Sequence, residues 1–302
     1  MRILVIKLGA LGDFVQAMGP AAAIRRHHAG AEITLLTAAP FAELARAAPY
    51  FDRVWIDERP GWLDPLGVWR LRRRLRGGYF DRVYDLQTSD RSGFYHRLMG
   101  RPPWSGIAPG ASLPHDNPAR DDMHTLDRQA EQLRRAGIRA VPPPDLTWAA
   151  RDPAPFGLPE RLLLLVPGGS AHRPQKRWPI ENYAALAVLA ARRRLTPVVL
   201  GGAPEAPLAA VILERCSTAR DLTGRTGFGE IVGLGKIAQR AIGNDTGPMH
   251  LLAAAGCPAT VLFSAASDPA LTAPRGPEVV VLRRANLAAL AVEEVAATLR
   301  MG

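Results

Sequence analysis

The stretch that decides the fold reads Ile242-Gly243-Asn244-Asp245-Thr246-Gly247-Pro248-Met249-His250. The apolar residues before it are typical of the end of a buried strand, and residues 251–255 after it are typical of a helix that ends at Gly256. Residues 259–263 are strand-like again. The order is therefore strand, tight loop, helix, strand, which is typical of an α/β protein with a parallel sheet.

The loop inside this stretch is suited to holding a phosphate. Thr246 or Gly247 suits the N-cap of the helix, and Pro248 suits its first turn. Unpaired N–H groups at a helix start point towards one place and attract an anion. An ordinary turn between a strand and a helix is the alternative. His250 at the helix start and a glycine-containing, basic stretch at residues 167–176 favour the phosphate site.

Length and composition place the chain among globular proteins. Its 302 residues predict two domains of ordinary size, and 47% of them are hydrophobic. Cys216 and Cys257 show neither metal-binding spacing nor a disulfide framework, which favours a cytoplasmic location. The first six residues are too short an apolar run for a signal peptide, and we expect no transmembrane segment.

The charge predicts an anionic partner. The formal net charge is +10, so nucleic acid, anionic lipid and a phosphorylated substrate all qualify. Aromatic residues make up only 6% of the chain, and we find no zinc-finger spacing and no RNA-binding aromatic motif. We therefore expect no nucleic-acid partner.

Strand and helix patterns alternate along both halves of the chain. In the first half we predict strands at 2–6, 32–37, 53–57 and 82–86, and helices at 14–28, 41–48, 66–75 and 124–136. In the second half we predict strands at 162–166, 197–200, 259–263 and 279–282, and helices at 180–193, 205–215, 228–238 and 292–300. A proline-rich segment at 141–159 is typical of a linker. The predicted domains are residues 1–150 and 151–290, followed by a C-terminal helix within 291–302.

Ligands of such sheets bind where strands end, so the loops after strands are the candidate sites. In the first of these loops Gly9 and Gly12 allow a tight turn, and Asp13 stands at the start of the next helix. Asp13 is either an N-cap or a general base with access to a hydroxyl. The Gly-x-x-Gly spacing is not the dinucleotide fingerprint, so a nicotinamide enzyme is poorly supported.

Two loops of the second half offer groups for a nucleotide. Ser170, Lys176 and Arg177 follow the strand at 162–166 and suit a pyrophosphate, with a basic surface loop as the alternative. Glu205 follows the strand at 197–200. It is suited either to accept hydrogen bonds from ribose hydroxyls or to cap the next helix.

Together these motifs resemble glycosyltransferase family nine, the heptosyltransferases that build the inner core of lipopolysaccharide. The resemblance covers nearly the whole chain, and the run Gly243-Asn244-Asp245-Thr246-Gly247-Pro248-x-His250 is its most specific part. The other matching residues are Lys7-Leu8-Gly9-x-x-Gly12-Asp13, Pro167-Gly168-Gly169-Ser170, Lys176-Arg177-Trp178-Pro179, Leu222-Thr223-Gly224, Phe263-Ser264 and Asp268-Pro269.

The resemblance implies a GT-B fold, in which two Rossmann-like doubly wound domains face each other across a cleft. It also implies an inverting, metal-independent transfer of heptose from ADP-heptose to an anionic glycolipid. On this reading Asp13 is the base, and the C-terminal helix packs back towards the first domain. Residues 264–267 read Ser-Ala-Ala-Ser where the family often has Gly-Pro-Thr, and this region bears on the donor sugar.

The resemblance also implies which residues bind each substrate. The donor-binding set is Ser170, Lys176, Arg177, Glu205, Asn244, Asp245, Thr246, Gly247 and His250. The acceptor-binding set is Lys7, Gly9, Gly12, Gln87, Arg91 and Arg128. His124 and Asp127, beside Arg128, resemble a family element near the acceptor, and a solvated helix start is their alternative. We expect no metal ligands and no cofactor other than the donor substrate.

An arginine-rich segment contains Arg70, Arg72, Arg73, Arg74 and Arg76 together with Trp69, Leu71 and Leu75. It is either a solvated helix face or a surface that rests on the cytoplasmic side of the inner membrane. Other functions also remain open at this point. They are a GT-B transferase or epimerase for another nucleotide sugar, and a non-catalytic protein that binds nucleotides or polyanions.

Overall fold

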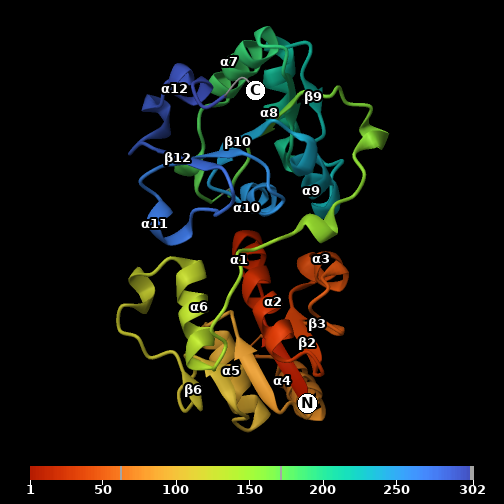
Figure 1. Ribbon diagram of the computed structural model, residues 1–302, viewed down its shortest axis with the longest axis vertical. Helices are drawn as coiled ribbons and strands as arrows, with labels where there is room; N and C mark the ends of the chain where they lie inside the picture. The colour runs from red at the N-terminus through yellow and green to blue at the C-terminus, as the bar shows by residue number, and fades with distance from the viewer. Residues whose placement is uncertain (62, 171, 300–302) are drawn as a thin grey trace. The chain divides into compact units, whose positions relative to one another are not determined.

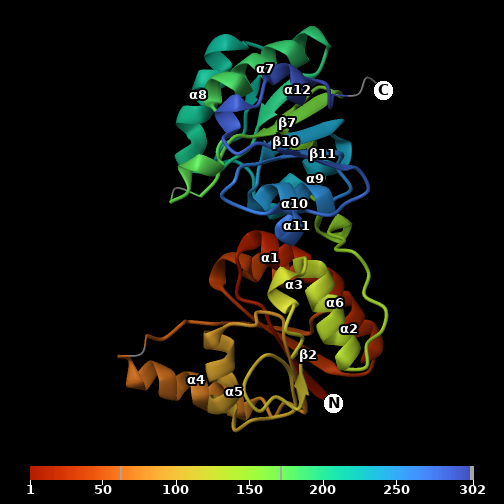
Figure 2. The ribbon, with the colours of Figure 1, turned by 90° about the vertical axis from the view of Figure 1, so that its left-hand side faces the viewer.

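The computed structural model describes residues 1–61, 63–170 and 172–299. The chain divides into two compact units, Met1–Pro144 and Asp145–Gly302, which we call the first and the second unit. Each unit contains one six-stranded sheet whose neighbouring strands are all parallel, with helices packed around it (Figures 1 and 2). The prediction of two doubly wound α/β domains is therefore confirmed.

The sheet of the first unit has the strand order β3-β2-β1-β4-β5-β6. Its strands are β1 (Arg2–Ile6), β2 (Glu32–Thr37), β3 (Arg53–Ile56), β4 (Arg82–Asp85), β5 (Trp104–Gly106) and β6 (Leu113–Pro114). Its helices are α1 (Leu11–Gln16), α2 (Met18–His27), α3 (Ala42–Ala47), α4 (Pro65–Gly77), α5 (Asp90–Met99) and α6 (Thr125–Arg135). The central strand β1 is apolar and buried, as a strand covered on both faces must be.

The sheet of the second unit has the order β12-β11-β10-β7-β8-β9. Its strands are β7 (Leu162–Val166), β8 (Thr196–Val199), β9 (Arg220–Asp221), β10 (Arg240–Asn244), β11 (Ala259–Phe263) and β12 (Val279–Arg283). Its helices are α7 (Ile180–Arg192), α8 (Ala206–Arg215), α9 (Phe228–Ile237), α10 (Gly247–Ala254), α11 (Pro269–Thr272) and α12 (Val292–Ala296). The predicted strand, loop, helix and strand around residue 245 are thus β10, α10 and β11.

The helix predicted at 14–28 is two helices, α1 and α2, that meet at Ala17. Pro20 lies one turn after Gln16 and has no N–H to donate to the Gln16 carbonyl, so a continuous helix would lack this hydrogen bond. The prediction of one helix here is wrong. The elements β5, β6, β9 and α5 were not predicted, and each of these three strands has only two or three residues.

The division between the units lies six residues before the expected boundary at 150. Leu146 is fully buried, and its backbone N–H donates to the carbonyl of Ala254 at 3.0 Å. The N–H of Arg151 donates to the Gly229 carbonyl at 3.0 Å. These bonds attach the middle of the proline-rich segment, whose first residues belong to the first unit, to the second unit.

The terminal helix α12 packs against α7 of its own unit. Its residues Val295 and Ala296, together with Leu299, lie in the same buried cluster as Trp178 and Tyr183. The burial of this apolar side holds α12 against α7. The helix ends at Ala296, and residue 300, the predicted end, lies outside the described residues. Among the described helices, none combines the length and the apolar composition needed to span a bilayer.

Candidate functional site

A small pocket in the first unit brings together four residues predicted from the sequence: Lys7, Asp13, Gln87 and Arg128. Its volume is about 80 Å³. The strands β1 and β4 are parallel neighbours with Ile6 opposite Asp85, so the residues that follow them emerge at one edge of the sheet. We call this the acceptor pocket, after the acceptor-binding role that the sequence predicts for Lys7, Gln87 and Arg128. Its remaining lining residues are Leu86, Thr88, Arg120, Gln129 and Gln132.

Lys7 forms the floor of the acceptor pocket and is 4% exposed. Its ammonium donates to the Leu86 carbonyl at 3.0 Å, and the N–H of the next residue, Leu8, donates to Gln87 Oε1 at 2.8 Å. Burial lowers the pKa of Lys7, while the nearby carboxylates of Asp13 and Asp85 act in the opposite direction. A buried cation thus lies next to the carboxylate that we predicted to be the base.

Asp13 serves its own helix and also lines the pocket. It is the third residue of α1, and its Oδ2 accepts a hydrogen bond from the Ala10 backbone N–H at 3.3 Å. The N-cap of α1 is therefore Ala10 and not Asp13, whose carboxylate instead accepts from the N-cap N–H across the first turn. The side chain is half-buried and stands in the pocket wall, so the carboxylate is also placed to meet a ligand.

Arg120, Gln129 and Gln132 complete the pocket and were not predicted. Arg120 donates to Thr88 Oγ1 at 2.6 Å and to Asp121 Oδ1 at 2.9 Å. Gln132 donates to the Asp85 carbonyl at 2.9 Å and to the Ser105 carbonyl at 3.2 Å. The two glutamines occupy the buried side of α6. The sequence did contain a signal for them: these two glutamines occupy positions of the helix pattern where buried apolar residues are expected.

The charges around the pocket favour an anionic ligand. Lys7, Arg120 and Arg128 are three cations, against the single carboxylate of Asp13 in the lining. The pKa of Arg120 is lowered first by burial and next by the charge of Arg128. Such a crowded, partly desolvated group of cations is stabilised when a phosphate or a carboxylate binds.

The other predicted acceptor residues lie elsewhere. Gly12 is in α1, and Gly9 lines a separate hollow in which a Cβ on Gly9 would stand 2.7 Å from the Phe41 ring. At its φ of +122° only glycine fits without strain. Arg91 is in α5, and its guanidinium donates to the Tyr95 hydroxyl at 3.3 Å. His124 accepts from the Leu126 N–H at 3.2 Å and so caps α6.

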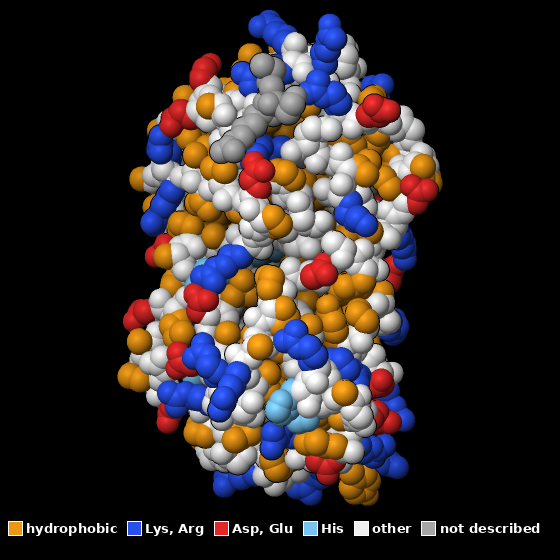
Figure 3. All heavy atoms as spheres, viewed as in Figure 1, with side chains coloured by type: hydrophobic (Ala, Val, Ile, Leu, Met, Phe, Trp, Pro, Cys, Tyr) orange, Lys and Arg blue, Asp and Glu red, His pale blue; other side chains and the backbone are white. Residues whose placement is uncertain are grey.

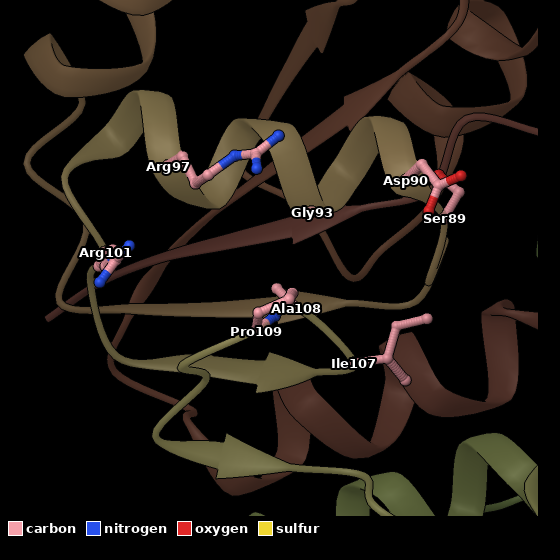
Figure 4. Close-up of a pocket in the computed structure, with 8 residues that line it drawn as sticks. All are labelled: Ser89, Asp90, Gly93, Arg97, Arg101, Ile107, Ala108 and Pro109. Atoms are coloured by element: carbon pink, nitrogen blue, oxygen red, sulfur yellow. The ribbon is translucent and has the colours of Figure 1, made fainter.

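A larger cavity of about 360 Å³ lies along α5 (Figure 4). Ser89 and Asp90 stand at one end of the helix and Arg97 nearer the other, while Ile107 follows β5. The turn from β4 to α5 thus contributes Gln87 and Thr88 to the acceptor pocket and the next two residues to this cavity.

In the second unit the buried side chain of Asn244 connects several loops. Its amide NH₂ donates to the carbonyls of Pro167 at 2.8 Å and Gly168 at 3.1 Å. Its oxygen accepts from the Trp178 N–H at 2.9 Å and the Tyr183 hydroxyl at 3.1 Å. These four bonds use the whole capacity of an asparagine amide. Asn244 is 0% exposed, so it organises the donor loops from within.

Lys176 and Asp245 form an ion pair of 2.6 Å beside the start of α10. Ser267 Oγ donates to the same Asp245 oxygen at 2.7 Å. Thr246 is the N-cap of α10 and Gly247 is its first residue, so the N–H groups of the first helical turn begin next to this pair. His250 lies in α10 and is 7% exposed.

The remaining donor candidates surround these loops. The guanidinium of Arg177 donates to the Gly169 carbonyl at 2.6 Å, and Ser170 is exposed. Glu205 Oε2 accepts from the Gly202 N–H at 2.8 Å, which is the capping role we considered. A Cβ on Gly168 would stand 2.7 Å from the Glu205 side chain, so this carboxylate packs against the loop after β7. Within the described ranges, no group of three or more His, Cys, Asp or Glu side chains is arranged to hold a metal ion.

Asp85 lies under the acceptor pocket at the end of β4 and is 0% exposed. Its Oδ1 accepts from the backbone N–H groups of Gln87 at 3.1 Å and Thr88 at 2.9 Å. Burial raises the pKa of Asp85 from 3.8 to about 6, against the opposing effects of these hydrogen bonds and of Lys7.

Replacing Asp85 by Asn tests this buried ionisation. Between pH 3.8 and about 6 the folded wild type binds more protons than the unfolded chain, so its stability falls as the pH rises through this window. Asp85→Asn keeps an acceptor for both backbone N–H groups and cannot ionise. We expect the variant to gain stability relative to the wild type across the window, by on the order of 3 kcal/mol. Urea unfolding at several pH values measures the difference, and a difference independent of pH would contradict the assignment.

Comparison with known proteins agrees with the motifs. The family model for glycosyltransferase family 9 (heptosyltransferase) matches residues 68–298, well over half of the chain. Lipopolysaccharide heptosyltransferase 2 of Salmonella typhimurium is 26% identical over 94% of this chain and 88% of its own length.

Solved structures show the same fold. That of E. coli ADP-heptose lipopolysaccharide heptosyltransferase II has a TM-score of 0.82 and 22% identity, over 99% of this chain and 97% of that one. A family 9 glycosyltransferase from Veillonella parvula has a TM-score of 0.83 and 21% identity, over 99% and 96% of the two chains. These matches confirm the predicted GT-B fold. With the family model covering most of its length, the chain belongs to glycosyltransferase family 9, the heptosyltransferases.

Proposed function

We propose that this enzyme transfers heptose from ADP-heptose, with inversion, to a lipopolysaccharide-core or related glycolipid acceptor. The observation that carries the proposal is the acceptor pocket, where the Asp13 carboxylate stands among Lys7, Arg120 and Arg128. The relatives are lipopolysaccharide heptosyltransferases, which supports heptose as the sugar and a lipopolysaccharide as the acceptor class.

The acceptor pocket supplies the chemistry for the attacking hydroxyl. Asp13 removes its proton as the sugar is transferred, and the cations hold an anionic group of the acceptor beside it. Gln87, whose oxygen is already fixed by the Leu8 N–H, has an NH₂ group to offer a sugar hydroxyl. Arg128 completes the binding of the anion from α6.

The loops at the start of α10 hold the diphosphate of the donor in this proposal. The N–H groups of the first helical turn and the ammonium of Lys176 face negative charge favourably. Lys176 has three N–H donors, so it can bind a phosphate oxygen while still paired with Asp245. Arg177 and Ser170 extend the phosphate contacts. Asp245 and His250 are assigned to the sugar side of the diphosphate.

Glu205 is assigned to the ribose. Its Oε2 is occupied by the Gly202 N–H, while Oε1 has no hydrogen-bond partner among the described residues. A free carboxylate oxygen suits the hydroxyl groups of a ribose. Ser267 belongs to the segment that departs from the family pattern, and it contacts Asp245. This segment therefore bears on which donor sugar is accepted.

We place the reaction at the cytoplasmic face of the inner membrane, with peripheral contact of the enzyme, because its acceptor is a glycolipid. The negative charge that develops on the departing diphosphate is stabilised by Lys176 and the α10 amides, without a metal ion. No nucleic-acid partner is part of this proposal.

Donor turnover in the wild type tests the proposed reaction. We expect ADP release from ADP-heptose when a truncated, water-soluble lipopolysaccharide-core acceptor is present, and no change when EDTA is added. UDP-sugars in the same assay test the alternative that the protein is a transferase or an epimerase for another nucleotide sugar. Donor binding without any turnover would favour a non-catalytic nucleotide-binding protein. Loss of activity in EDTA, with recovery in Mg²⁺, would contradict the metal-independent mechanism.

Asp13→Asn tests the assignment of the base. The amide oxygen can still accept from the Ala10 N–H, so the start of α1 is preserved. We expect kcat to fall by roughly 10²–10⁴-fold, with donor affinity nearly unchanged. The matched control is Asp121→Asn, which neutralises an exposed carboxylate beside Arg120 and Arg128 outside the pocket lining. If Asp13→Asn keeps the turnover of this control, Asp13 is only a helix cap.

Lys176→Ala tests the diphosphate contact. We expect kcat/KM for the donor to fall roughly ten- to a hundred-fold, since charge-assisted contacts are worth about 1.5–3 kcal/mol. The variant also leaves Asp245 without its partner, so Lys176→Ala with Asp245→Asn serves to separate the two effects. ADP affinity, measured by calorimetry, should stay low in the double variant while stability recovers. If Lys176→Ala binds ADP as tightly as the wild type does, Lys176 does not contact the diphosphate and has only a structural role.

A further inference from the structure

The outward face of α4 carries apolar and cationic side chains together. Leu66, Trp69, Arg70 and Arg73 recur at helical spacing, so they form one stripe along the helix. Leu66 is 59% exposed and Trp69 is 52% exposed. The opposite side of α4, which includes Leu71 and Leu75, is buried in the core of the first unit.

Large apolar side chains also flank the helix. Leu63, before its start, is 99% exposed, and Tyr79, after its end, is 78% exposed. Single exposed apolar residues are ordinary on a protein surface, but a concentration of them marks an interaction site. Four of the eight most exposed large apolar residues described belong to this one segment, residues 63–79. We call this segment the α4 surface.

The arginines of α4 fall into two groups. Arg74 donates to the Ile56 carbonyl at 3.0 Å and stacks over Trp55, and Arg76 donates to the Leu98 carbonyl at 3.0 Å. The side chains of Arg74 and Arg76 are therefore held by contacts within the first unit. Arg70, Arg72 and Arg73 have no ion-pair partner among the described residues, and the guanidinium of Arg73 lies 5.6 Å from the Trp69 ring centroid. Their charges are therefore available to an anionic partner.

The α4 surface is open to a large, flat partner. Within the first unit α4 lies at the periphery, beside α5 (Figure 2). Figure 3 draws the side of the first unit away from α4, where Lys and Arg side chains are also spread among apolar ones, so positive charge by itself does not mark the α4 surface. A surface that combines indole and aliphatic groups with guanidinium groups is typical of helices that lie in the interface of an anionic bilayer.

We infer that the α4 surface docks the enzyme on an anionic lipid bilayer. Leu63, Leu66 and Trp69 enter the interfacial region, while Arg70 and Arg73 contact the lipid phosphates. The inference rests on the proposed function, since a membrane-held acceptor gives the docking its purpose. A nucleic acid would also pair with arginine, but its phosphate backbone would not bury the exposed aliphatic side chains of Leu63 and Leu66.

Vesicle binding by the full chain, without donor or acceptor, tests the inference. The vesicles contain phosphatidylglycerol and phosphatidylethanolamine, and phosphatidylcholine vesicles serve as the neutral comparison. We expect Arg70→Gln with Arg73→Gln to weaken binding to the anionic vesicles about 30-fold, which is equivalent to about 2 kcal/mol for two near-surface charges. We expect Trp69→Ala to weaken it about ten-fold. Salt should weaken wild-type binding.

Arg192→Gln with Arg194→Gln is the matched control, since it removes two exposed arginine charges from the second unit. We expect it to bind vesicles within a few-fold of the wild type. Equal loss in both double variants, or no loss in either, would overturn the inference. Tight binding of random RNA without vesicle binding would do the same, by assigning the arginines to nucleic acid.

Transfer to a water-soluble acceptor separates this inference from the proposed function. We expect the Arg70→Gln and Arg73→Gln double variant to keep wild-type turnover on such an acceptor. Wild-type vesicle binding together with no transfer would disprove the proposed function and leave the docking surface in place. Normal transfer with no vesicle binding would overturn the docking alone.

Discussion

The buried amide of Asn244 is the interaction on which the loops of the candidate donor site depend. It stands at the end of β10, and its four hydrogen bonds reach the loop after β7, the backbone of Trp178 and the hydroxyl of Tyr183. Because β10 and β7 are parallel neighbours, their loops emerge together, and the amide fixes the distance between them. The ion pair between Lys176 and Asp245 is then formed by residues whose backbones are already placed. Ordering of this kind lowers the cost of binding a flexible diphosphate.

In the first unit, buried and half-buried charges organise the acceptor pocket. Lys7 is held against the Leu86 carbonyl at the bottom of the acceptor pocket, with Asp13 and Asp85 as its nearest acids. Arg120 and Arg128 add positive charge from a segment far along the chain. The lining is consequently net cationic before any ligand arrives, with the Asp13 carboxylate as its single acid.

Much of this arrangement could be predicted from the sequence. Alternating strands and helices predicted the fold class, and loops after strands pointed to Lys7, Asp13 and Gln87. The family resemblance added Arg128 in α6, and one pocket brings these four residues together. Arg120 was missed because it lies in a loop with no periodic pattern. The motif marked Asn244 but could not distinguish an amide that binds a ligand from one buried among loops. Likewise, the amphipathic pattern of α4 identified the helix, yet only the packing showed that Leu71 and Leu75 point inward while Leu66 and Trp69 remain outside.

The ion pair of Lys176 with Asp245 has a consequence for the end of the catalytic cycle. If the proposed reaction leaves ADP in the site, its departure would normally strand a partly buried ammonium without a counter-ion, and that cost would lengthen the residence time of the product. Asp245, at 2.6 Å, stays paired with the ammonium and so remains as its counter-ion. On the proposed function, the pair would therefore ease product release, at the expense of some affinity for the nucleotide.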